Sequence, residues 1–167
     1  MGFCYFVNRD QTEERQPMPS KYERDFFKWT QEQVGHLRAG RFKALDLAHL
    51  AEEIESMGVS ERREIRNRLR ILLQHLLKWE YQPDCRSSGW KATITEQRVG
   101  IESVLADSSS LTVFPESILE NCYCWAIRQA AAETSLAEAD FPATCPYSLK
   151  HVLAFEFWPG PGEPSVP

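Results

Sequence analysis

The chain has 167 residues, of which 43% are hydrophobic and 26% are charged, and its formal net charge is -5 at pH 7. A chain of this length can bury roughly two thirds of its unfolded surface, so a single globular domain needs neither disulfides nor a metal for stability. The acidic balance argues against nucleic acid as the main partner, and no apolar run approaches the roughly 20 residues of a membrane-spanning helix, so no membrane contact is expected.

The cysteines indicate a reducing compartment. There are five, an odd number, and no two of them form a CxxC pair. This usage fits free thiols better than a secreted disulfide framework or a zinc site. The first residues also lack the basic segment of a signal peptide. We therefore expect a cytoplasmic protein without a bound metal. The cysteines are Cys4, Cys85, Cys122, Cys124 and Cys145.

The two ends differ from the rest of the chain. Residues 1–19 show no apolar periodicity, which is typical of a disordered arm or of upstream sequence translated from a misplaced start. Residues 159–167, PGPGEPSVP, contain four prolines and two glycines and predict a tail that forms neither helix nor strand. The domain itself is expected to occupy residues 20–158.

Helical periodicity begins immediately after the arm. The first predicted helix spans residues 22–38, with Ser20 as its N-cap and Gly40 beyond its end. The second begins after a capping Asp46, has an apolar stripe, and is expected to stop at Gly58, because glycine is the usual residue after a helix C-terminus. The stripe consists of Leu47, Leu50, Ile54 and Met57.

The third predicted helix, residues 61–80, is the longest and carries a broad apolar face that should form the spine of the core. Pro83 ends it. A fifth helix covers residues 115–133, and a short last helix begins at Pro146, since proline suits the first turn. Between the third and fifth, a fourth helix is expected to turn inward Trp90, Ile94, Ile101, Val104 and Leu105. Nothing in the sequence predicts a strand, so we expect an all-α bundle of five main helices and one short C-terminal helix.

Six sequence blocks in a fixed order resemble the bacterial family catalogued as number 29 among the domains of unknown function. They cover nearly the whole predicted domain, which makes the resemblance specific. It implies an all-helical fold and assigns no activity. The blocks are YERDFFKW at 22–29, LAEEIESMG at 50–58, SERREI at 60–65, LLQHLLKWEYQP at 72–83, the SSGW, TIxEQR and final Ile of 87–101, and FPATCPYSL at 141–149.

An arginine stripe lies beside the apolar face of the third helix. Its members, which follow one another at i,i+4 spacing, are Arg62, Arg66 and Arg70. Their like charges would repel one another unless nearby groups neutralise them. One interpretation is that Glu53 or Glu55 forms ion pairs with them. The other is that the stripe, with its neighbouring arginines, binds a phosphate or a nucleic-acid backbone.

A second set of polar residues is a candidate pocket or polar network. His75 lies at the edge of the apolar face near Trp79, where a partly buried imidazole could titrate near neutral pH or simply be hydrogen-bonded in the core. Gln97 falls inside an apolar stripe, so its amide must find partners or line a ligand pocket. The complete set is Glu53, Glu55, His75, Trp79, Gln97 and Arg98.

The motif HLAEE places His49 and Glu53 on one helical face, and His75 could join them as a metal ligand. His49 is expected to face solvent, however, whereas metal ligands in a helical bundle converge inward. We therefore expect no metal centre here.

No catalytic constellation is present: there is no GxSxG motif and no glycine-rich phosphate loop, so neither an enzyme nor a cofactor is favoured. The leading hypothesis is a non-catalytic module that binds an unidentified protein through an exposed helix face. The alternatives are an enzyme or ligand-binding protein with a polar pocket between helices two, three and four, and a weak nucleic-acid binder that uses the stripe from Arg62 to Arg70. The sequence does not set the oligomeric state.

Overall fold

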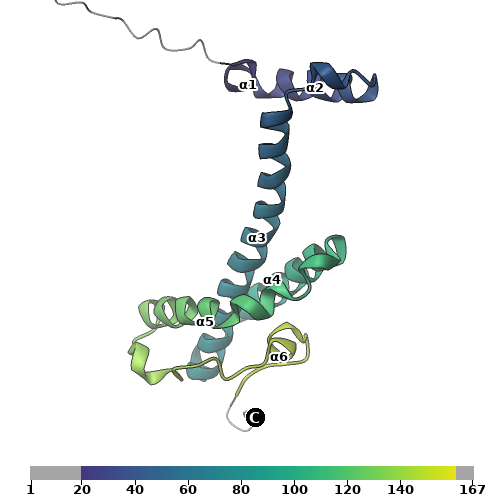
Figure 1. Cartoon of the computed structure of the whole chain (residues 1–167). Helices are drawn as coiled ribbons and strands as arrows, with labels where there is room; N and C mark the ends of the chain where they lie inside the picture. Colours follow the sequence, from purple (N-terminus) through teal and green to yellow (C-terminus); the bar gives the residue numbers. More distant parts are fainter. Residues whose placement is uncertain (1–19, 161–167) are drawn as a thin grey trace, which may run out of the picture. The chain divides into compact units, whose positions relative to one another are not determined.

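The computed structural model describes residues 20–160, so the expected arm at 1–19 and most of the expected tail lie outside the described residues. Within this range every regular element is a helix, joined by short 3-10 turns (Figure 1). The all-α prediction is therefore confirmed for this part of the chain. The helices are α1 (Lys21–Arg24), α2 (Phe26–Arg38), α3 (Leu47–Tyr81), α4 (Ser88–Asp107), α5 (Phe114–Glu133) and α6 (Leu149–Leu153).

The long helix α3 corrects the sequence prediction. Two helices separated at Gly58 were expected, but Gly58 and Ser60 lie inside one helix of 35 residues. A glycine ends a helix when it adopts a left-handed conformation. Among the described residues only Gly40 does so, with φ of 66°. Gly58 instead stays helical, because no proline follows it and an interior glycine weakens a helix without stopping it.

The chain divides within α3 into two compact units, one ending at Glu53 and the other beginning at Ile54. In the first unit, Ser20 forms a capping box with Glu23, as its predicted N-cap role requires. The predicted helix at 22–38 is nevertheless interrupted. Asp25 leaves helical geometry and its side chain caps α2 by accepting from the Lys28 amide at 3.0 Å.

An aromatic cluster holds the first unit together. The buried Trp29 donates from Nε1 to the Asp46 carboxylate at 3.2 Å, and the same carboxylate caps the start of α3 at the His49 amide. The His49 ring stacks on Tyr22 with centroids 4.2 Å apart. His49, which was expected to face solvent, is therefore half-buried, because one face of its ring packs on Tyr22.

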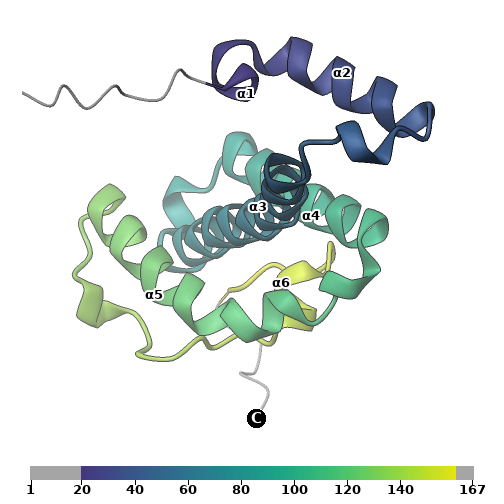
Figure 2. The same ribbon diagram turned by 45° about the horizontal axis from the view of Figure 1, so that its top comes forward.

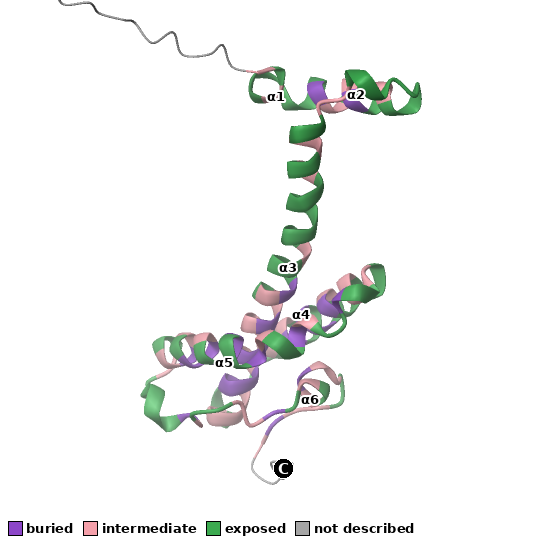
Figure 3. Cartoon of the chain, viewed as in Figure 1, coloured by how far each residue is buried: buried purple, intermediate pink, exposed green. Residues whose placement is uncertain are grey.

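The second unit is built around the second half of α3, as expected for the spine of the core. The helices α4, α5 and α6 surround it (Figure 2), and Figure 3 shows burial concentrated where they meet. Nearly all of the predicted apolar face is fully buried. These buried residues of α3 are Ile65, Leu69, Leu72, Leu73, Leu76 and Leu77.

The last helix begins later than predicted. Ser148, not Pro146, starts it: the Ser148 hydroxyl accepts from the His151 amide at 3.3 Å, and α6 runs from Leu149. Pro146 lies in the preceding irregular segment because a better side-chain cap follows it. Pro159, where the tail was expected to start, is buried, so the packed chain extends at least that far.

Candidate functional site

Arg98, from the predicted polar set, is fully buried and binds the C-terminal segment. Its guanidinium donates to the backbone carbonyls of Val152 at 2.9 Å and Phe157 at 2.8 Å, with a longer contact to Phe155 at 3.4 Å. Burial lowers the pKa of Arg98 to about 10, which leaves it charged at neutral pH. Its three acceptors are all backbone groups, so this arginine acts as a structural tie.

Gln97 and Trp79 also have specific partners. The Gln97 carbonyl oxygen accepts from Arg68 at 3.5 Å, and the Trp79 ring packs against Trp158 with centroids 4.8 Å apart. Arg68 can lie over α4 because Gly100 faces it: a Cβ at Gly100 would fall 2.3 Å from its guanidinium. These contacts join α4 to α3 and the C-terminal segment to α3.

His75 is half-buried and donates from Nδ1 to the Ile71 carbonyl at 2.9 Å. Burial lowers its pKa from the ordinary value of 6.5, and the hydrogen bond to Ile71 only partly opposes this. The nearby Lys78 is almost fully buried and pairs with Glu133 at 2.5 Å. The imidazole is therefore neutral in the folded state near pH 7.

The two glutamates of the polar set have other surroundings. The Glu53 carboxylate accepts a hydrogen bond from the Tyr22 hydroxyl in the first unit, and Glu55 is exposed on α3. Within the second unit, His75, Gln97 and Arg98 each bond to a different group. His75, Gln97 and Arg98 thus make separate contacts in the second unit.

The arginine stripe lies against aromatic rings. The guanidinium carbons of Arg62 and Arg66 are 5.6 and 5.9 Å from the centre of the Phe114 ring, and that of Arg70 is 5.4 Å from the centre of Trp125. The ion pairs among residues 20–160 involve none of the three. They are Lys21–Glu32, His49–Asp46, Arg68–Glu64 and Lys78–Glu133. The pairing of the stripe with Glu55, which belongs to the first of the two interpretations, is not among them.

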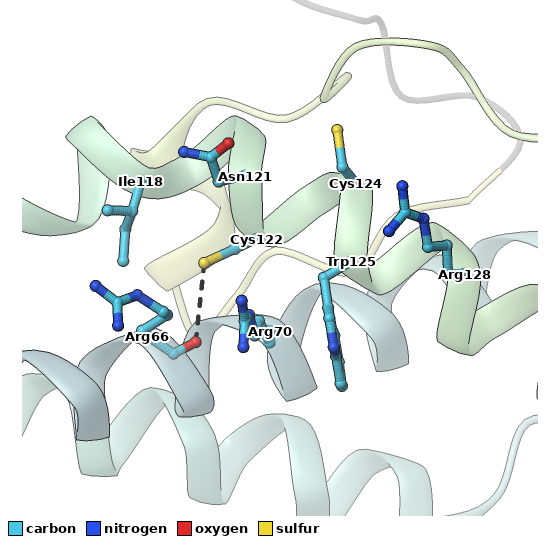
Figure 4. Close-up of a pocket in the computed structure, with 8 residues that line it drawn as sticks. All are labelled: Arg66, Arg70, Ile118, Asn121, Cys122, Cys124, Trp125 and Arg128. Atoms are coloured by element: carbon cyan, nitrogen blue, oxygen red, sulfur yellow. Dashed lines mark hydrogen bonds between the residues drawn. The ribbon is translucent and has the colours of Figure 1, made fainter.

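Two arginines of this stripe line a cavity between α3 and α5 (Figure 4). Its volume is about 480 Å³. Arg66 and Arg70 project from α3, and α5 supplies the other lining residues. They are Ile118, Asn121, Cys122, Cys124, Trp125 and Arg128. No carboxylate is among them, so three guanidiniums set the charge of the cavity.

The groups at the floor of the cavity are buried. Cys122 donates from Sγ to the Arg66 carbonyl at 3.8 Å (Figure 4). Burial raises the pKa of the Cys122 thiol, although the charges of Arg70 and Arg66 and a hydrogen bond from the Arg70 side chain oppose the rise. The Nε of Arg70 is buried and has no hydrogen-bond partner among the described residues. This unpaired donor is the most unusual polar group of the site, because buried donors are normally satisfied.

The arginines on the α3 side of this cavity were predicted from the sequence as a candidate anion site, but the residues on the α5 side were not. Asn121, Trp125 and Arg128 follow at i, i+4 and i+7, which places them on one helical face. That spacing was available in the sequence, but only the packing of α5 against α3 puts it opposite the arginine stripe. No group of three or more histidine, cysteine, aspartate or glutamate residues in the described part of the chain could hold a metal ion.

The fold and this cavity define an all-α protein with a cationic cavity between two helices. The chain belongs to the family described as Domain of unknown function DUF29, whose family model matches residues 21–158, and the resemblance seen in the sequence blocks is thereby confirmed. Comparison with curated proteins and with solved structures found no match. No helix within residues 20–160 is long and apolar enough to cross a membrane.

Proposed function

We propose that this protein is an interaction module that binds an amphipathic helix of a partner protein along the first turns of α3. The observation that carries the proposal is an exposed apolar stripe, Leu47, Leu50, Ile54 and Met57, here called the α3 seam. Leu47, Ile54 and Met57 are 67%, 67% and 70% exposed, and Leu50 is half-buried. Figure 3 shows this half of α3 as largely exposed.

The spacing of the α3 seam supports a helical partner. Its residues are separated by three, four and three positions, which is the a/d pattern of a coiled coil. Such a pattern on an exposed helix leaves apolar side chains in water, and burying each one fully contributes about 1.5–3 kcal/mol. Contiguous apolar patches on a protein surface often mark sites of protein–protein interaction.

The charges beside the α3 seam support a basic partner. Between residues 46 and 61 the helix carries acidic side chains and no lysine or arginine. A partner helix with lysine or arginine at its flanking positions would complement this surface, whereas a second copy of the same segment would bring like charges together. The acidic residues are Asp46, Glu52, Glu53, Glu55 and Glu61.

We also propose a cytoplasmic location. It is supported by the four cysteines of residues 20–160, which are all free thiols. Free thiols persist in reducing compartments.

Photo-crosslinking in the native host tests the interaction. A photoreactive amino acid replaces Met57 on the α3 seam or, as the matched control, Val99, an exposed apolar residue of α4. We expect one recurrent protein adduct from position 57 and none of that mass from position 99. Mass spectrometry of the adduct then identifies the partner peptide, which should be a helix-forming segment with basic flanks.

Other outcomes would contradict the proposal. An adduct of the chain with itself would make the α3 seam a self-association surface. Equal adducts from positions 57 and 99 would indicate non-specific contact, and the absence of any adduct would remove the evidence for a partner at the seam.

A further inference from the structure

We propose that the cavity between α3 and α5 binds the phosphate group of a small organic phosphate. The inference is independent of the α3 seam, because it concerns a different part of α3 and a different kind of ligand. It rests on the charge of the lining, on the position of Arg70 and on the size of the cavity (Figure 4).

The charge of the lining is entirely positive. Arg66, Arg70 and Arg128 contribute three guanidiniums, and the lining contains no aspartate or glutamate. The ion pairs of the described residues lie elsewhere and leave these three arginines without a carboxylate. Cations that line one cavity without a carboxylate favour an anion there.

Arg70 provides the second observation. Trp125 packs against its guanidinium at 5.4 Å, and its Nε is shielded from solvent. The ring holds the guanidinium in place but accepts no conventional hydrogen bond from Nε. An oxyanion in the cavity would accept from the terminal nitrogens of this guanidinium, which is one of the charged groups that line the cavity.

The size and shape of the site favour a phosphate ester over a free carboxylate. A phosphate group carries up to two charges and three or four acceptor oxygens, so it can engage several arginines at once, whereas one carboxylate cannot. The volume of about 480 Å³ lies within the usual range for small-molecule sites. Ile118 and Trp125 provide apolar wall for the organic part, and Asn121 adds an amide.

The test follows the arginine Nε–H signals by NMR while inorganic phosphate, glycerol phosphate or acetate is added at constant ionic strength. We expect the Arg66 and Arg70 signals to shift with both phosphates in a saturable way, and with glycerol phosphate at lower concentration. Acetate should produce a much weaker response. Circular dichroism of each variant establishes that it remains folded.

Two matched variants locate the site. Arg128→Gln changes an exposed lining residue, and Arg63→Gln makes the same charge change at an exposed position of α3 outside the lining. We expect the first to weaken glycerol phosphate binding by about tenfold or more, since it removes charge-assisted hydrogen bonds. The second should change the affinity by about twofold or less.

Several results would overturn the inference. Equal shifts with acetate and phosphate, or equal weakening by Arg128→Gln and Arg63→Gln, would show diffuse attraction of anions without a site. NMR shifts that keep growing with the concentration of inorganic phosphate, without saturation, would also exclude a specific binding site. Tight, steeply salt-dependent binding of a single-stranded oligonucleotide that both variants weaken would assign the arginines to nucleic-acid contact instead.

Discussion

At the scale of single residues, the strongest structural role belongs to Arg98. Replacing it by methionine keeps much of its bulk but removes the donors to the carbonyls of Val152, Phe155 and Phe157. Because buried acceptors would then lack partners, we expect the free energy of unfolding to fall by about 3 kcal/mol, measured by urea denaturation. Arg63→Met, at an exposed position, should change it by less than about 0.5 kcal/mol. Equal effects of the two variants would contradict the structural role of Arg98.

His75 should make stability depend on pH. Its pKa is lowered in the folded protein, so on acidification the unfolded chain binds a proton at His75 before the folded one does. The free energy of unfolding should therefore be unaffected by this group above pH 6.5, the ordinary pKa, and decrease as the pH falls below it. Denaturation curves at a series of pH values should show a smaller decrease for His75→Gln. An unchanged slope in that variant would exclude His75 as a source of the pH dependence.

At the scale of secondary structure, the continuity of α3 predicts opposite effects at two glycines. Gly58 is helical and exposed, and a Cβ there would meet no atom within 4 Å. Gly58→Ala should therefore raise the free energy of unfolding by about 0.5–1 kcal/mol. Gly40→Ala should lower it by about 1 kcal/mol or more, because φ at Gly40 is 66°. Chemical denaturation measures both. Destabilisation by Gly58→Ala would mean that α3 breaks there, as the sequence first suggested.

The elements show what the sequence could and could not predict. The buried face of α3 and the bounds of α5 follow closely from apolar periodicity, because burial on one side of a helix repeats every 3.6 residues. The interruption of the first helix at Asp25 and the continuity of α3 at Gly58 could not be predicted from the sequence. At each position the residue is compatible both with a helix end and with a continuous helix, and short motifs do not distinguish the two. The arginine stripe was visible in the sequence, but its partners Phe114 and Trp125 come from a distant helix and required the tertiary structure.

At the scale of the whole molecule, the acidic flanks of the α3 seam predict that the purified protein does not pair through it. Self-association would place like charges side by side along the seam. Sedimentation velocity at low salt should give the mass of a monomer for the wild type and for Ile54→Asp alike. A dimer that Ile54→Asp dissociates would show that the seam binds a second copy.

Binding of a basic amphipathic helix by the α3 seam is proposed to be the function of the whole molecule. The most direct test is to measure by calorimetry how tightly the partner peptide identified by crosslinking binds the wild type, Ile54→Asp and Val99→Asp. We expect Ile54→Asp to weaken binding by at least about 100-fold, because it puts a carboxylate into the apolar contact. Val99→Asp, which adds the same charge at an exposed apolar residue of α4, should change the affinity by about twofold or less. Equal loss in both variants, or no loss in Ile54→Asp, would contradict it.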